Sequence, residues 1–254
     1  MILFISILCG LVSTADDTPT EAEVRPARLA IIAIGPKPAR RFSNTGSTIL
    51  APKEGEVPPR RLYFEIAQEE GREKILNSIN VTFNNPSHFI NVPANKSLRL
   101  LVRKKNEYIK YINTKPLAER STTIIILRPE GVGDRRWLKE PLKYEINLIS
   151  EPFKNKKVAI LNLSRRAIKS VFHEDRQVLE AGGFQTYESI KELGLHRIAA
   201  AYGKENKVIY NTAMRLNKNN QLIIFVLYDA NPNTNDGRTV GVLRFSVDIE
   251  QPSS

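Results

Sequence analysis

The chain has 254 residues, a length that suits one large domain or two small ones. Hydrophobic residues make up 41% of it and charged residues 26%, a composition that excludes a disordered or a membrane-embedded chain. The net charge of +11 favours anionic partners.

The first fifteen residues differ from the rest. Met1 to Val12 form an apolar run, and Ser13-Thr14-Ala15 places small residues where a signal peptidase reads them. We therefore expect a signal peptide at residues 1–15, a mobile polar lead-in at residues 16–27 and an exported protein, periplasmic or extracellular. The apolar run is too short to span a bilayer, so the mature chain is expected to have no transmembrane segment. A lipid-modified Cys9 and an apolar N-terminal strand are the alternative interpretations.

Cleavage would remove Cys9, the only cysteine. The mature chain would then have no disulfide, no thiol nucleophile and no thiolate metal ligand. Its stability would depend on hydrophobic cores, which suits domains of roughly a hundred residues. A basic exported protein meets acidic polysaccharides and phospholipid head groups, so nucleic acid is the weaker partner prediction.

Short β-type runs dominate the chain from residue 29 onwards and are separated by Pro, Gly and Asn clusters. Thr122–Leu127, with the sequence TTIIIL, predicts a strand buried on both faces. The other strands predicted in the first series are Leu29–Ile34, Leu62–Ala67, Ile79–Phe83, Leu98–Val102, Glu107–Ile112 and Leu142–Leu148.

A second series begins after Asn155-Lys156-Lys157. It ends as the first does, with an apolar strand, a polar loop and another strand. This pattern predicts an all-β fold of two tandem small β-sandwich (Ig-like) domains at residues 28–150 and 155–250, related by divergent duplication. The predicted strands are Val158–Leu163, Ile168–Phe172, Arg176–Leu179, Arg197–Tyr202, Lys207–Arg215, Leu222–Tyr228 and Val240–Ile249.

Recognisable catalytic motifs are missing from the sequence. His88, His173 and His196 show no metal-ligand spacing, and no G-x-S-x-G elbow occurs. Carboxylates are abundant, but no pair is marked out as the acid and base of a glycosidase. We therefore predict a protein that is not an enzyme and needs no cofactor. A small extracytoplasmic hydrolase with its site near His173 or His196, and a structural subunit of a surface assembly, are the alternatives.

One loop has a weak calcium signature. Its oxygen-bearing side chains alternate like the first ligands of a calcium loop, at Asp229, Asn231, Asn233 and Asp236. Val240 then stands where a bidentate Glu is needed. The same residue types are common in any long β-connection, so a plain loop is the competing interpretation.

Basic clusters recur along the chain, and some lie near aromatic residues, a combination that suits acidic sugars. A solvated surface is the alternative for each cluster. Trp137 is expected to anchor its loop against the core, and a ligand platform is the alternative. The candidate anionic-ligand residues are Arg103, Lys104, Lys105, Tyr108, Arg135, Arg136, Arg165 and Arg166.

The strand at Val158–Leu163 carries the motif Asn162-Leu163-Ser164 and is followed by a glycine turn at Gly182-Gly183. This layout resembles an uncharacterised family of exported bacterial proteins with tandem β-sandwich repeats, in which a strand of the form F-V-N-L-(S/T) precedes a hairpin and a glycine turn. It is similar, more distantly, to periplasmic accessory proteins of alginate acetylation. Export, tandem β-domains, the missing catalytic motifs and the basic charge together predict a binding or scaffolding protein of the cell envelope, with an envelope protein, an anionic polysaccharide or lipid head groups as its partner.

Overall fold

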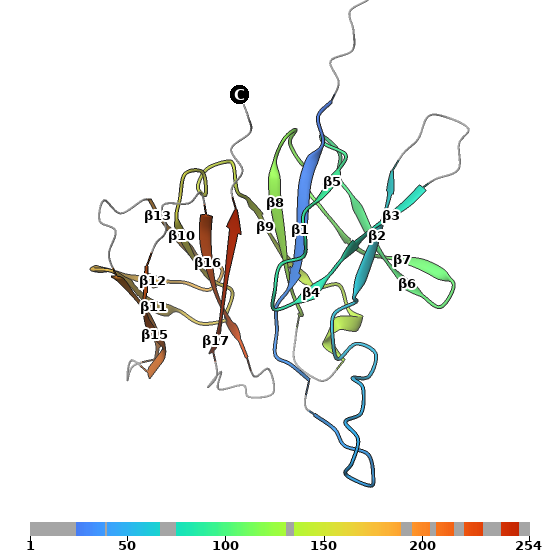
Figure 1. Cartoon of the computed structure of the whole chain (residues 1–254), viewed down its shortest axis with the longest axis horizontal. Helices are drawn as coiled ribbons and strands as arrows, with labels where there is room; N and C mark the ends of the chain where they lie inside the picture. Colours follow the sequence, from blue (N-terminus) through green and yellow to red (C-terminus); the bar gives the residue numbers. More distant parts are fainter. Residues whose placement is uncertain are drawn as a thin grey trace, which may run out of the picture.

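The computed structural model describes residues 24–38, 40–66, 75–130, 135–188, 195–203, 207–215, 221–230 and 240–248. The predicted signal peptide and most of the lead-in lie outside these ranges. Within them the fold is all-β and consists of four sheets (Figure 1). No helix in this described part is long and apolar enough to cross a membrane.

The first half of the chain forms two of the sheets. We call them the first inner sheet and the first outer sheet. The first inner sheet has the order β4-β1-β8-β9, with β5 also paired to β1; its strands are β1 (Ala27–Ala33), β4 (Thr82–Phe83), β5 (Ile90–Val92), β8 (Thr122–Arg128) and β9 (Leu142–Asn147). The first outer sheet has the order β3-β2-β6-β7, with β2 (Arg61–Ile66), β3 (Ile75–Asn80), β6 (Arg99–Lys104) and β7 (Glu107–Asn113).

The second half forms the other two sheets. The second inner sheet has the order β13-β10-β16-β17, with β10 (Val158–Asn162), β13 (Phe184–Tyr187), β16 (Gln221–Asp229) and β17 (Val240–Asp248). The second outer sheet has the order β12-β11-β14-β15, with β11 (Ile168–Phe172), β12 (Asp175–Leu179), β14 (Leu195–Tyr202) and β15 (Lys207–Arg215).

Strand order and direction repeat between the halves. In each inner sheet the first strand of the half runs parallel to its penultimate strand, which is antiparallel to the last one: β1, β8 and β9 match β10, β16 and β17. Each outer sheet has four antiparallel strands in the equivalent order. Even an irregularity recurs, because the register shifts at Leu100/Leu101 in β6 and at Ala200/Ala201 in β14.

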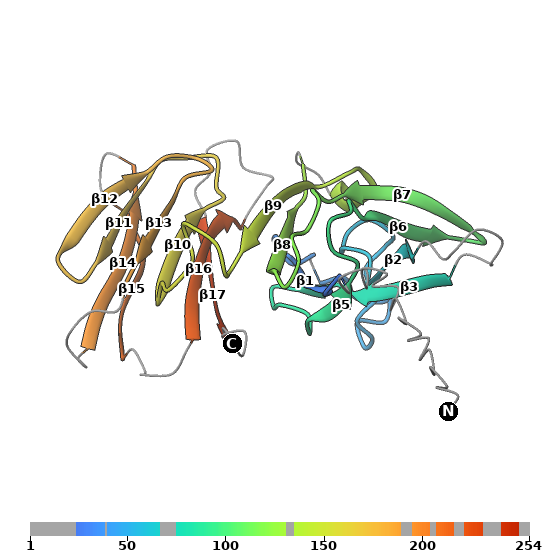
Figure 2. The same cartoon turned by 90° about the horizontal axis from the view of Figure 1, so that it is seen from above.

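The four sheets stack as outer, inner, inner and outer layers, with an apolar core in each of the three spaces between them (Figure 2). Successive side chains of β1 point to opposite faces of the sheet, so this one strand contributes to two cores. Leu29 and Ile31 pack toward the first outer sheet, whereas Ala30 and Ile32 pack toward the second half. Thr122–Leu127 is buried on both faces as predicted, because β8 also lies between two layers.

A cluster of polar groups lies where the two halves meet. Arg128, at the end of β8, donates from its guanidinium to the backbone carbonyl of Leu163 in the second half. The same guanidinium lies 3.8 Å from the carboxylate of Asp229, which is also 3.7 Å from Arg165. The halves are therefore joined by a buried core and by a partly buried set of ionic contacts.

The predicted strand at Ile79–Phe83 is in fact two strands. The chain leaves the first outer sheet at the end of β3 and enters the first inner sheet as β4, and buried Val81 lies between them. The short strands β5 and β13 were not predicted. Each is an edge strand that pairs antiparallel with the first strand of its half, so it lacks the long apolar run of a central strand.

Candidate functional site

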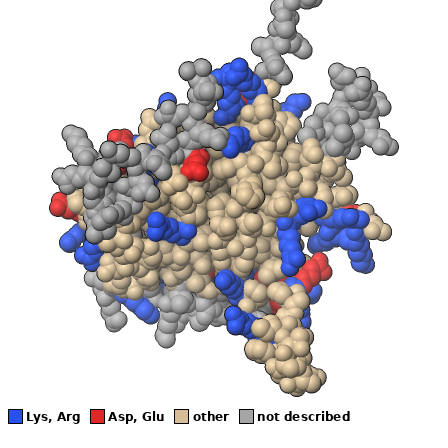
Figure 3. Space-filling view, viewed as in Figure 1, with Lys and Arg blue, Asp and Glu red and all other residues tan. Residues whose placement is uncertain are grey.

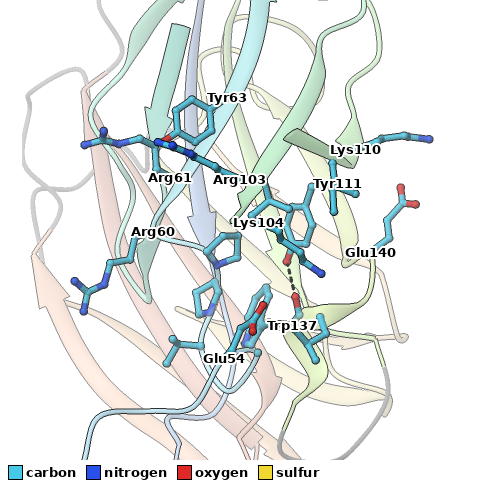
Figure 4. A pocket seen from close by; sticks show the side chains of 17 residues that line it. Glu54, Arg60, Arg61, Tyr63, Arg103, Lys104, Lys110, Tyr111, Trp137 and Glu140 are labelled. Atoms are coloured by element: carbon cyan, nitrogen blue, oxygen red, sulfur yellow. Dashed lines mark hydrogen bonds between the residues drawn. The ribbon is translucent and has the colours of Figure 1, made fainter. Parts of the chain in front are cut away.

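A cavity of about 500 Å³ is lined by residues of both β2 and β6 (Figure 4). The two antiparallel strands are paired at Tyr63 and Leu101. On one side of this pair lie Arg61 of β2 and Arg103 of β6, and both line the cavity. The charged side chains that line the cavity are Glu54, Arg60, Arg61, Arg103, Lys104, Lys110 and Glu140.

The cavity is strongly cationic, because five of its lining residues are Lys or Arg and only two are Glu. Charges of one sign around a concave site add their potentials and attract counter-ions. Lysine and arginine also gather over the part of the surface where the β6–β7 hairpin lies, at the right of Figure 3. This end of the molecule is therefore suited to an anionic ligand.

The strand register of the first outer sheet explains why these Lys and Arg side chains lie close together. Leu101 pairs with both Tyr63 and Lys110, so these three side chains leave the same face of the sheet. Arg103 lies two residues further along β6 and pairs with Tyr108 of β7. Side chains two apart on a strand share a face, so the positive charges of neighbouring strands form one group.

Aromatic rings form part of the rim and the floor. Tyr63 and Tyr108 make an edge-to-face contact with ring centroids 5.0 Å apart, and Tyr108 is 39% exposed. Deeper in the cavity, the hydroxyl of buried Tyr111 donates to the backbone carbonyl of Trp137 at 3.3 Å (Figure 4). Burial raises the pKa of Tyr111, so this phenol stays protonated and keeps its role as a donor.

The remaining wall is held by a turn of 3-10 helix, η1 (Arg136–Leu138). The amide of Trp137 donates to the carbonyl of Gly55 at 3.0 Å, and Nε of Arg135 donates to the carbonyl of Glu54 at 3.1 Å. Gly55 has a φ of +84°, and a Cβ atom there would lie 2.5 Å from Cγ of Leu138. Only glycine fits this close approach, so the segment that carries Glu54 is fixed against η1.

The candidate anionic-ligand residues predicted in the first half occupy different positions in the structure. Arg103 and Lys104 line the cavity, and Tyr108 lies beside it on Tyr63. Lys105 occupies the β6–β7 turn with a φ of +52°. Arg135 holds the cavity wall. Buried Arg136 donates to the carbonyl of Pro36 at 3.0 Å, which is a structural contact.

The candidates of the second half are not brought to this cavity. Arg165 contacts Asp229, and Arg166 lies next to Ser164, whose hydroxyl accepts from the amide of Arg166 at 3.4 Å. Asp229, the first of the calcium candidates, is engaged with Arg128 and Arg165; the other three, Asn231, Asn233 and Asp236, lie outside the described residues. In the part of the chain that is described, no group of three His, Cys, Asp or Glu could hold a metal ion.

Sequence reasoning did not select Tyr63, Arg60, Arg61 or Lys110 as site residues. The signal was present in part, because Arg60 and Arg61 are adjacent basic residues in the sequence. What was missing is the pairing of β2 with β6, which brings residues about forty positions apart to one face. Trp137 packs in the core of the first half as expected, with 3% of its surface exposed, and it also lines the cavity.

No protein-family model matches the chain, and no curated protein matches it at a significant level. Its function therefore has to be inferred from its own residues and their geometry.

Proposed function

We propose that this chain is a non-catalytic binding protein of the cell envelope whose cavity between β2 and β6 holds an anionic polysaccharide. The observation that carries the proposal is the excess of Lys and Arg around that cavity, next to the Tyr63–Tyr108 pair. Guanidinium groups bind carboxylates through two parallel hydrogen bonds, so Arg61 and Arg103 could each hold one acidic group.

The tyrosine pair favours a sugar polymer over a lipid head group or a protein. A sugar ring has an apolar C–H face and a polar hydroxyl edge. The rim offers the matching surfaces, since tyrosine combines a hydrocarbon ring with a hydroxyl group. Export is part of the proposal and is supported by the apolar run at Met1–Val12 and the small residues that follow it.

Charge reversal at the cavity should weaken binding at this site. The double variant R61E/R103E is expected to bind polygalacturonate at least about tenfold more weakly than the wild type in low salt, a loss of about 1.4 kcal/mol. Wild-type affinity should itself fall as salt is added, because exposed charges are screened. Isothermal titration calorimetry at two ionic strengths measures both effects.

The matched control is K96E/R120E, which reverses two exposed cations outside the cavity. Equal weakening in both double variants would show that net charge, and not the cavity, sets affinity. Binding to vesicles of anionic phospholipid but not to polygalacturonate would reassign the ligand to lipid head groups.

A hydrolase is the second candidate, because two carboxylates, Glu54 and Glu140, line the same cavity. The variants E54Q and E140Q separate the two functions. If the protein only binds the polymer, each variant removes one negative charge and should bind polygalacturonate a few fold more tightly. Neither the wild type nor the variants should then release reducing ends. In a hydrolase, either variant should abolish the release of reducing ends from the polymer, which a reducing-sugar assay detects.

We also propose that the two halves are tandem Ig-like sandwiches that arose by duplication. The equivalent strand orders and the shared register shift at Leu100/Leu101 and Ala200/Ala201 support this. Under this proposal, the ligand cavity belongs to one repeat, and the other repeat carries an equivalent outer sheet.

A further inference from the structure

A second hollow, of about 430 Å³, lies on the outer face of the second outer sheet. It crosses all four strands of that sheet. Its lining residues are Lys169, Ser170, Val171, Arg176, Gln177, Val178, Arg197, Ala199, Ala200, Ala201 and Val208.

Small side chains in the central strand create the hollow. Across the four strands, one row of directly paired residues consists of Val178, Lys169, Ala201 and Val208. The next row places Ala199 beside Val171. The alanines leave a depression between longer neighbours, and Val178 and Val208 at its two sides are 57% and 61% exposed. The floor is therefore aliphatic and open.

Positive charge surrounds this floor. Lys169, Arg176 and Arg197 are all exposed, and none of the residues that line the hollow is acidic. Nε of Arg197 donates to Oδ1 of Asn211 at 3.3 Å, which orients its guanidinium along the sheet. A second copy of this chain would bring like charges together, so the hollow selects an anionic partner.

The two cationic hollows occupy equivalent sheets at opposite ends of the molecule. The layers follow the order outer, inner, inner, outer, so the outer faces of the two outer sheets point away from each other (Figure 2). A ligand in one hollow leaves the other accessible. The buried core between the inner sheets fixes the two faces in this opposed arrangement.

We propose that the second hollow is a second binding site for anionic polysaccharide, and that one molecule thereby bridges two polymer chains. This proposal rests on the proposed function of the first cavity. In the second site, Arg176 and Arg197 bind acidic groups, and the floor of Ala199, Ala201 and Val171 packs against sugar C–H groups. Two sites on one rigid body gain affinity for a surface that carries many chains.

Two measurements with the full chain test the bridge, at a concentration where light scattering gives the mass of a single chain. The first is the number of short galacturonate oligomers bound per chain, by calorimetry. The second is the clumping of beads coated with polygalacturonate. The wild type should bind two oligomers and clump the beads. The variant R176E/R197E should bind one oligomer, coat the beads and fail to clump them.

The variants R61E/R103E and K96E/R120E complete the test. R61E/R103E should also bind one oligomer without clumping, whereas K96E/R120E should behave as the wild type. Clumping by R176E/R197E as strong as that of the wild type overturns the second site. A wild type that binds one oligomer and leaves the beads dispersed overturns the bridge but preserves the proposed function. No binding by the wild type overturns both proposals.

Discussion

Replacement of Asn162 by alanine should lower the free energy of unfolding by about 3 kcal/mol or more. The Asn162 side chain is fully buried, and its Nδ2 lies 2.6, 2.8 and 3.1 Å from the carbonyls of Arg166, Leu179 and Glu180. Its Oδ1 accepts from the amide and the hydroxyl of Ser164, at 3.1 and 2.6 Å. Alanine would remove the side-chain donor to the buried carbonyl of Leu179 and the acceptor of the buried Ser164 amide and hydroxyl.

Urea unfolding followed by far-ultraviolet circular dichroism measures this loss. Asn80→Ala is the matched control, because Asn80 is exposed on β3 and its replacement should change stability by less than about 0.5 kcal/mol. Similar midpoints for the two variants would mean that the Asn162 contacts contribute little. The motif Asn162-Leu163-Ser164, which carried the family resemblance, is thus expected to have a structural role: it ties β10 to the turn after β12.

Most strands could be predicted from the sequence because each carries its own signal. The runs at Ile168–Phe172 and Lys207–Arg215 have the bounds of β11 and β15. Both runs are rich in β-branched and aromatic residues and are flanked by polar residues, so local chemistry is sufficient. The short edge strands lack this signal, because much of their stability comes from pairing with β1 or β10.

The candidate cavity could be predicted only in part, because it depends on which strands become neighbours. A basic cluster such as Arg103-Lys104 is visible in the sequence, but its alignment with Arg61 follows from the pairing of β2 with β6. Arg135-Arg136 shows the same limit. These adjacent residues have the same chemistry, yet one is exposed on the cavity wall and the other is buried against Pro36.

The buried core between the inner sheets was also invisible to sequence reasoning. A strand that is buried on both faces has an apolar sequence, whether the layer that packs on its second face belongs to the same domain or to another. The runs LAIIAI and TTIIIL were consistent with two separate sandwiches. In the structure, their second faces pack against β10, β16 and β17 of the other half.

This shared core predicts that the two halves unfold together. Ile224 of β16 is fully buried in it and is not a member of the core within the first half. Ile224→Ala should destabilise the chain by about 2–5 kcal/mol. Because exposing one inner sheet also uncovers the other, the first half should lose its stability at the same urea concentration as the second.

Trp137 makes this measurable, because it is the only tryptophan and is buried in the first half. Its fluorescence and the far-ultraviolet circular dichroism should give one midpoint in the wild type, and Ile224→Ala should shift both signals equally. Val208→Ala, at an exposed site of the second half, should shift neither. A tryptophan transition that stays in place while the dichroism acquires an earlier step would mean that the halves are stable independently. The opposed cationic hollows would then be joined by a weak contact, and their fixed geometry, on which the bridging proposal depends, would be lost.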